Sequence, residues 1–312
     1  MKKILILGGF GFIGTNILKY IDLYRKDVGV VIFDLKSSHP YGVDFKCVEC
    51  TYAGDLSDIG LMNRILSEHK FDYIIHLVSS TYPLKSDNPK FDIESNLIPS
   101  VNFFRAAAEH KVENIIFISS GGAIYGQTNS EHRHVESDVA FPISSYGVVK
   151  LAIEKYLFQT AVLYPIKPLV LRLSNPFGRY HFSLKQGICN VAMRKALNGD
   201  TFTIWGDGSA KKDYFFIDDF CRILFMLIDK DINFRILNIA SGNMLSVNDI
   251  MAAVKKIVPD FKWTYSQPLQ TDVRHFELDT TALMRIIGSF KFTDFNVALM
   301  QTYEWLKSAG NL

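Results

Sequence analysis

The fold is decided by the sequence KKILILGGFGFIG at residues 2–14. A continuous apolar run such as residues 2–7 is typical of a strand buried on both faces of a sheet. Gly8, Gly11 and Gly14 end the run, and a helix-periodic segment follows at 12–24. Glycines allow a sharp turn and let a phosphate approach the backbone at the start of a helix. The stretch therefore predicts a strand, a glycine turn and a helix that together can hold a phosphate.

The same alternation continues through the first half of the chain and predicts an α/β fold with a doubly wound parallel sheet of about six strands. The further strands are expected at 28–34, 45–48, 72–77, 114–119 and 167–173, and the helices at 58–69, 92–110 and 146–163. Shorter elements after residue 175, with helices at 188–197, 247–258 and 296–307, predict a smaller second lobe; Ser246 is expected to cap the second of these helices. We expect one domain to comprise 1–174 and 214–240, and the other 175–213 and 241–312.

Composition excludes several classes of protein. The 312 residues are 48% apolar with a net charge of +2, which excludes disorder and gives no field for nucleic acid or an anionic membrane. No apolar run reaches the roughly 18 residues of a membrane span, so we expect no membrane insertion. Four cysteines favour a reducing cytoplasm. No metal is expected, because Cys47 and Cys50 form a lone pair and the loop histidines His132 and His134 are interpreted as solvated.

Asp34 ends the second expected strand about 20 residues after the last glycine of the turn. A carboxylate there can accept hydrogen bonds from both ribose hydroxyls of a dinucleotide, and it would repel a 2′-phosphate. NAD is therefore the expected cofactor rather than NADP, although Lys36 lies nearby. Asp55 and Leu56 are weaker candidates for contact with the adenine, because an Asp before a helix is also an ordinary cap.

Tyr146 and Lys150 lie four residues apart at the start of an expected helix, so both side chains share one face. A free phenol has a pKa near 10, and a neighbouring ammonium favours the phenolate. The pair therefore predicts a proton shuttle. The ordinary alternative is a solvated surface pair. Ser119 and Ser120, at the end of the strand before this helix, favour the catalytic interpretation.

Taken together, the motifs resemble the extended short-chain dehydrogenase/reductases, whose fold is of the Rossmann type, and especially the nucleotide-sugar 4-epimerases. The resemblance extends over nearly the whole chain. It rests on GGFGFIG at 8–14, Asp34, GDL at 54–56, HLVSS at 76–80, Asn96, SSGGAIYG at 119–126, SSYGVVK at 144–150, RLSNPFG at 172–178 and WGDGSAKKDYFFIDD at 205–219.

The resemblance implies roles for individual residues. Tyr146 would be the base, Lys150 would lower its pKa, and Ser120 would complete the catalytic set. NAD would be bound by Gly8, Gly11, Phe12, Ile13, Gly14, Asp34, Leu35, Asp55, Leu56, Leu77, Val78, Ser79, Asn96, Ser119, Tyr146, Lys150 and Pro176. The nucleotide sugar would be bound by Ser120, Tyr146, Asn175, Gln186, Trp205, Lys212 and Arg274.

Three positions depart from the family pattern. Gly121 stands where the family usually has a hydroxyl residue, and Ser120 is the available substitute. Lys212 replaces an arginine and lacks its planar fork. The later phosphate-binding arginine has no clear counterpart except Arg274. The neighbouring 4,6-dehydratases carry an acidic pair where this chain has Gly122 and Ala123, so dehydration is not expected, since neither residue transfers a proton.

The leading hypothesis is an NAD-dependent 4-epimerase of UDP-glucose, UDP-galactose or an N-acetylated form, for polysaccharide or glycan precursor synthesis. The alternatives are an NAD(P)H-dependent 4-keto reductase of a deoxysugar nucleotide and a catalytically silent nucleotide-binding protein, the latter prompted by Gly121. The helices at 92–110 and 146–163 are apolar on more than one face, and the resemblance implies a homodimer through a four-helix bundle. Burial of these faces within a monomer is the other interpretation.

Overall fold

The computed structural model of the protein describes residues 1–81, 88–126, 132–268 and 275–309. The chain divides into two compact units. Unit 1 comprises Met1–Ile124, Pro142–Arg172 and Leu227–Leu237, and unit 2 comprises Tyr125–Phe141, Leu173–Met226 and Asn238–Leu312. Among the described residues, none of the helices combines the length and apolar character that crossing a membrane requires.

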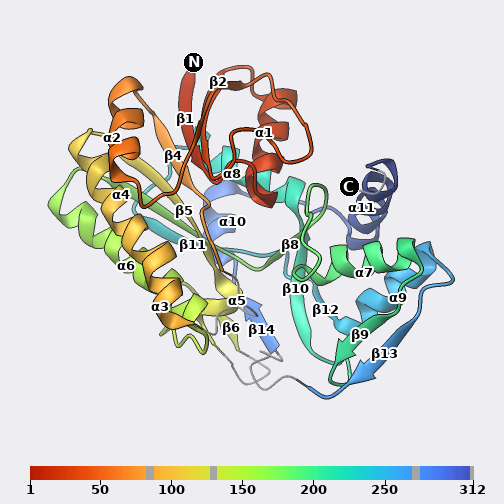
Figure 1. Ribbon diagram of the computed structural model, residues 1–312. Helices are drawn as coiled ribbons and strands as arrows, with labels where there is room; N and C mark the ends of the chain where they lie inside the picture. Colours follow the sequence, from red (N-terminus) through yellow and green to blue (C-terminus); the bar gives the residue numbers. More distant parts are fainter. Residues whose placement is uncertain (82–87, 127–131, 269–274, 310–312) are drawn as a thin grey trace. The chain divides into compact units, whose positions relative to one another are not determined.

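A seven-stranded sheet with helices on both faces organises unit 1, which confirms the predicted α/β class (Figure 1). Strand β1 pairs in parallel with β2 and with β4, and the pairs β2–β3 and β4–β5 are also parallel. In spatial order the strands are β11 (Arg235–Ile239), β7 (Lys167–Leu173), β5 (Asn114–Ser120), β4 (Tyr73–His76), β1 (Lys2–Leu7), β2 (Val28–Asp34) and β3 (Val48–Ala53). The helices are α1 (Phe12–Tyr24), α2 (Ile59–Glu68), α3 (Pro89–Asp92), the π-helix η2 (Ile93–Leu97), α4 (Ile98–Glu109), α5 (Gly121–Ile124) and α6 (Ser145–Leu163).

The strand expected at 45–48 begins only at Val48. The reason lies in α1, where the Asp22 carboxylate accepts hydrogen bonds from the backbone N–H groups of Lys46 (3.0 Å) and Cys47 (2.8 Å). This segment therefore follows a side chain of α1 before it enters the sheet, so the prediction was wrong by about three residues. The helix expected at 92–110 also differs, because it consists of the successive segments α3, η2 and α4.

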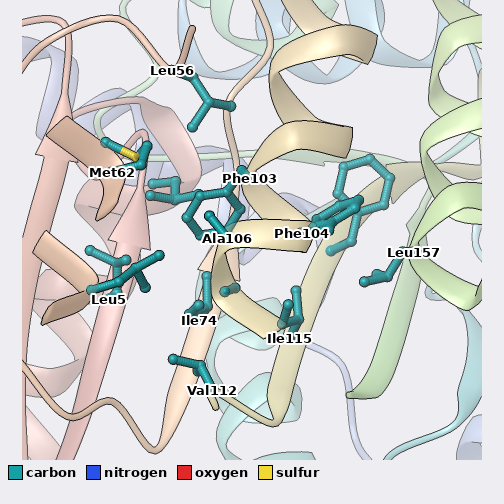
Figure 2. Packing of buried hydrophobic residues seen from close by; sticks show 14 of the residues in the cluster. Leu5, Leu56, Met62, Ile74, Phe103, Phe104, Ala106, Val112, Ile115 and Leu157 are labelled. Carbon is teal, nitrogen blue, oxygen red and sulfur yellow. The ribbon is translucent and has the colours of Figure 1, made fainter. Parts of the chain in front are cut away.

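The core of unit 1 holds α6 in place. Helix α4 packs against both α2 and α6, and Phe103 and Phe104 on α4 are fully buried. Figure 2 shows these rings between side chains of the sheet, such as Ile115, and Leu157 of α6. Because each of these side chains is removed from water, the cluster stabilises the fold and fixes α6 against the sheet.

Unit 2 contains smaller sheets. One has the order β12-β10-β14-β6 with β8 added to β10, and β13 pairs with β9. Ser246 caps α9 and forms a capping box with Asp249, which confirms the predicted cap. The strands are β6 (Arg133–His134), β8 (Asn175–Phe177), β9 (Phe202–Trp205), β10 (Lys211–Phe216), β12 (Met244–Ser246), β13 (Trp263–Ser266) and β14 (His275–Leu278). The helices are α7 (Ile188–Asn198), α8 (Ile217–Asp229), α9 (Val247–Ile257), α10 (Thr281–Ile287) and α11 (Phe295–Ser308).

Candidate active site

The turn between β1 and α1 contains glycines at positions where a side chain would either be strained or fill the space that a ligand needs. Gly8 has φ +81°, a left-handed conformation that favours glycine. A Cβ at Gly14 would lie 2.5 Å from the carbonyl oxygen of Gly9, so no side chain fits there. A Cβ at Gly11 would meet, among the described residues, only the Gly8 oxygen at 3.4 Å. The space beside Gly11 at the start of α1 is therefore open to a group such as a pyrophosphate, which fits NAD.

Phe12 and Ile13 form the first turn of α1, which contains no acidic residue. The positive end of the helix dipole is therefore not neutralised by a carboxylate within that turn. Asp34, at the end of β2, accepts hydrogen bonds from the backbone N–H groups of Phe10 (3.0 Å) and Lys36 (3.2 Å). Its carboxylate thus lies beside the glycine turn and keeps further acceptor capacity for a ribose.

The residues after β3 have contacts of their own. The Asp55 carboxylate accepts hydrogen bonds from the N–H (2.9 Å) and hydroxyl (2.6 Å) of Ser57, and these lower its pKa. Leu56 is 4% exposed and belongs to the apolar core, whereas Leu35 is 72% exposed. The Leu56 side chain thus packs in the core, and Leu35, Asp55 and Leu56 remain predicted cofactor contacts.

The segment after β4 lies against the glycine turn. The backbone nitrogen of Val78 would be 3.3 Å from a Cβ at Gly8, and the Leu77 N–H donates to Leu7. Asn96 is buried, and its side-chain oxygen accepts a hydrogen bond from the Ser80 N–H at 2.7 Å. Asn96 therefore holds this segment in place from η2.

Helix α6 begins at a cap formed by Ser144, whose hydroxyl accepts a hydrogen bond from the Gly147 N–H. Gly147 is required there, because a Cβ would lie 2.3 Å from the Ala123 carbonyl oxygen. Close contact between α5 and α6 follows, and it brings the first turn of α6 beside the end of β5.

Lys150 is buried on the face of α6 that covers the sheet. Its Nζ donates to the Ile118 carbonyl oxygen at 3.0 Å and lies 5.8 Å from the centre of the Tyr146 ring. Burial lowers the pKa of Lys150 to about 8, and the charge of Glu154 opposes that shift. Tyr146 and Lys150 therefore share one helix face, as predicted.

The pKa of Tyr146 differs from the expectation. Burial raises it to about 12, while side-chain hydrogen bonds with Ser120 and Ser79 act to lower it. The spacing of Tyr146 and Lys150 suggested a lowered pKa, which the described side chains alone do not produce. The effect of burial on the phenol is larger than that of the two hydrogen bonds.

Ser120 supplies a hydroxyl near the phenol, which Gly121 cannot do. Gly121 begins α5 and is buried, whereas Ser120, the last residue of β5, is within hydrogen-bonding reach of the phenol. The contact from Ser79 was not anticipated, although Ser79 was among the expected cofactor residues. Ser119 instead donates to the Glu154 carboxylate at 2.6 Å.

Of the expected substrate residues, Ser120 and Tyr146 lie in unit 1, whereas Asn175, Gln186, Trp205 and Lys212 lie in unit 2, as does Pro176. The Asn175 amide donates to the Asp213 carbonyl oxygen at 2.9 Å, and Lys212 directly precedes Asp213 on β10. Trp205 is 53% exposed at the end of β9, and Gln186 is exposed. Arg274 lies outside the described residues.

His132, His134 and Asp138 also meet in unit 2. The Asp138 carboxylate contacts His132 Nε2 at 2.6 Å and His134 Nδ1 at 3.3 Å, and it accepts from the Val135 N–H. Asp138 thus contacts both histidines. His132 is exposed, as expected, but His134 is 3% exposed on β6, so its interpretation as a solvated loop residue was wrong. All four cysteines are free thiols.

Comparison with known proteins places these features in a family. The family model for NAD dependent epimerases/dehydratases matches residues 4–240. An Escherichia coli dTDP-4-dehydro-6-deoxyglucose reductase is 29% identical, and the match covers 91% of each chain. A putative UDP-glucose 4-epimerase from Methanocaldococcus jannaschii is 26% identical over 98% of each chain. The solved UDP-glucose 4-epimerase of Thermotoga maritima, with UDP-glucose, has a TM-score of 0.90 at 28% identity and covers 98% of this chain and 99% of that one. The family predicted from the motifs is thereby confirmed, and the chain belongs to the NAD dependent epimerase/dehydratase family.

Proposed function

We propose that the protein is an NAD-dependent 4-epimerase of a nucleotide-activated hexose, UDP-glucose and UDP-galactose or their N-acetylated forms. The observation that carries the proposal is the Tyr146 phenol, which contacts Ser120 at the end of β5 and shares a helix face with Lys150. The similarity to proteins named UDP-glucose 4-epimerase supports the class of substrate.

In this proposal Tyr146 Oη takes the proton from the sugar 4-hydroxyl and later returns it. Ser120 donates a hydrogen bond to the phenolate, and the Lys150 ammonium stabilises its charge. NAD, when bound there, would supply the acceptor for the C4 hydride and would return it to the opposite face of the resulting 4-keto sugar. Asp34 and the glycine turn hold the cofactor in the proposed arrangement.

We assign the nucleotide sugar to the second domain, 175–213 and 241–312. Asn175 and Lys212 would contact the diphosphate, where a lysine neutralises charge without bidentate geometry. Trp205 offers an exposed aromatic face for the base, since aromatic rings stack on flat rings. Gln186 and Arg274 complete the proposed set, and 1–174 with 214–240 would form the NAD-binding domain.

The residues of α5, which follows β5, do not supply the groups that a dehydration needs. Elimination requires an acid–base pair beside the sugar. Gly122 and Ala123 of α5 carry no ionisable group. This separates the proposal from the dehydratases of the same family.

A second candidate is a 4-keto reductase of a deoxysugar nucleotide. The similarity to the Escherichia coli dTDP-4-dehydro-6-deoxyglucose reductase favours it, and the same Tyr–Lys pair would serve as proton donor. The two functions differ in their use of cofactor, because an epimerase regenerates NAD in each turnover and a reductase consumes NADH or NADPH.

The experiment is to incubate the protein with UDP-glucose, UDP-galactose and their N-acetylated forms and to follow the anomeric proton signals by NMR. Interconversion of one pair without added reductant supports the epimerase. If no pair interconverts, and NADH or NADPH is oxidised with a dTDP-4-keto-6-deoxy sugar, the protein is a reductase.

We also propose a homodimer through the helices of one face of unit 1. Val148, Tyr156 and Leu163 of α6 are 52%, 46% and 65% exposed and recur at helical spacing, and Phe91 and Ile98 on the neighbouring helices are 46% and 49% exposed. Apolar side chains gathered in this way favour a partner helix pair.

We infer that the protein works in the cytoplasm, in line with its four free thiols, and supplies sugar nucleotides for polysaccharide or glycan synthesis.

A further inference from the structure

A buried ion pair between Glu154 and Arg172 lies one helical turn after Lys150 on α6. Glu154 on α6 has a fully buried side chain, and the Arg172 side chain on β7 is 2% exposed. The guanidinium donates from Nη2 to Oε2 at 2.7 Å, and from Nε to Oε1 at 3.1 Å and to Oε2 at 3.3 Å. The sequence analysis gave neither residue a role, although Glu154 follows Lys150 by four positions and Arg172 begins the RLSNPFG motif at the end of an apolar strand.

The pair is in register with the predicted catalytic residues. Tyr146, Lys150 and Glu154 recur at four-residue intervals along one face of α6. The end of β5 contacts each of them in turn. Ser120 binds the phenol, the Ile118 carbonyl accepts from Lys150, and the Ser119 hydroxyl donates to Glu154. Helix and strand are thus joined by three polar contacts, and one of them involves the Glu154 carboxylate.

The charges that face Lys150 can be counted. Among the described residues, Glu154 is the acidic group whose charge acts on Lys150 and raises its pKa. His76 on β4 is fully buried, and burial together with Lys150 lowers its pKa to about 3, so it is neutral near neutral pH. On the other sides lie Tyr146, the Phe117 ring 4.8 Å from Nζ, and Arg172 beyond the carboxylate. A buried ammonium without a nearby anion would favour its neutral form.

We propose that Glu154 is a positioning residue, whose carboxylate, fixed by Arg172 and Ser119, keeps the buried Lys150 in its charged form beneath Tyr146. The role rests on the proposed function, because a charged Lys150 matters only where the phenol must ionise. The carboxylate touches neither the phenol nor any reacting atom, so it acts through Lys150. Arg172 holds the carboxylate in place, and Ser119 satisfies a second acceptor site on Oε1.

Direct titration of Lys150 tests this without any substrate. The ¹³Cε signals of labelled lysines are followed against pH in the NAD-loaded protein, and the Lys150 signal is assigned by its loss in Lys150→Met. Glu154→Gln should move the Lys150 midpoint to lower pH by about one unit, since a nearby opposite charge is lost. An unchanged midpoint would overturn the proposal.

Activity supplies a second readout. For the sugar pair that the protein interconverts, the alkaline limb of kcat against pH should move to lower pH in Glu154→Gln by the same amount, while KM near neutral pH changes little. A uniform loss of kcat at every pH, with the limb in place, would show a merely structural role. If the wild-type protein interconverts no sugar, the proposed function fails, and the titration still decides the role of Glu154.

Further variants keep the test open if Glu154→Gln does not fold, because a lone buried Arg172 is costly. Glu154→Gln combined with Arg172→Gln leaves a neutral pair; the midpoint should still fall, but by less than in Glu154→Gln alone, because the guanidinium charge that repels Lys150 is also removed. Ser119→Ala should shift the midpoint less. Glu109→Gln, on the exposed side of α4 where Glu109 pairs with Arg105, is the matched control and should leave the midpoint unchanged.

Discussion

At the scale of single residues, the proposed proton transfer depends on the hydrogen bond between Ser120 and the Tyr146 phenol. Ser120→Ala removes a hydrogen bond that acts to lower the pKa of the phenol. Because a hydrogen bond to a charged group contributes about 1.5–3 kcal/mol, we expect kcat to fall by about 10- to 100-fold. The acid limb of the pH profile should also move to higher pH.

Steady-state kinetics of Ser120→Ala against pH provide the measurement. Ser80→Ala is the matched control, because Ser80 contacts Asn96 through its backbone N–H. Wild-type kcat in Ser120→Ala would mean that another group supports the phenol.

The sequence predicted the residues of this site better than their environment. The spacing of Tyr146 and Lys150 placed them on one helix face, and the glycines of the β1–α1 turn were identified by type and position. The hydrogen bond from Ser79 and the buried Glu154 were missed, because they depend on how α6 packs against the segment after β4 and against β5. The rise in the pKa of Tyr146 has the same cause, since burial cannot be read from spacing.

At the scale of secondary-structure elements, the glycine turn depends on close backbone contact. A Cβ at Gly14 would lie 2.5 Å from Gly9 O and 2.7 Å from Gly8 O, so Gly14→Ala must displace backbone. We expect a loss of about 2 kcal/mol or more in the free energy of unfolding, together with weaker NAD binding. Chemical denaturation and calorimetric titration with NAD measure the two effects.

Gly60→Ala on α2 is the control for that change. A Cβ at Gly60 would meet Asp58 Oδ1 at 3.4 Å, and alanine favours a helix over glycine by about 1 kcal/mol. The variant should be as stable as the wild type or more stable. Equal stability of both alanine variants would contradict the close contact at Gly14.

Element boundaries were predictable where the apolar pattern was strong. Strand β1 and helix α1 have the expected bounds, because Ile4 to Leu7 are fully buried and the glycines end the strand. Strand β3 was misplaced because its entry is set by Asp22, a side chain on another element. Long-range contacts of this kind leave no local signal in the sequence.

At the scale of the whole molecule, the buried His76 links stability to pH. Burial lowers its folded-state pKa to about 3, below the ordinary 6.5. Between these values the unfolded chain binds a proton that the folded chain excludes, so stability falls as pH falls. Lowering the pH from about 7 to 5 should cost about 2 kcal/mol through this group.

Urea unfolding of the wild type and of His76→Gln at both pH values measures that contribution. The variant should lose less stability than the wild type on acidification, whatever its stability at pH 7. Identical losses would show that another group accounts for the acid sensitivity.

Assembly also belongs to this scale. If α6 and its neighbours form the proposed dimer interface, Tyr156→Glu places a charge among apolar partners and should favour the monomer. Sedimentation velocity over a range of concentrations should show a dimer for the wild type and a monomer for the variant. A wild-type monomer at every concentration would contradict the proposed interface.

The most direct measurement of the central claim is epimerisation in D₂O, followed by NMR at C4 of the sugar. The account predicts that the wild type interconverts a UDP-hexose pair with C4 still bearing its original hydrogen, because the hydride leaves and returns within the site. Tyr146→Phe should retain NAD and lose this turnover, by about 100-fold or more. Deuterium at C4, or full turnover by Tyr146→Phe, would contradict the account.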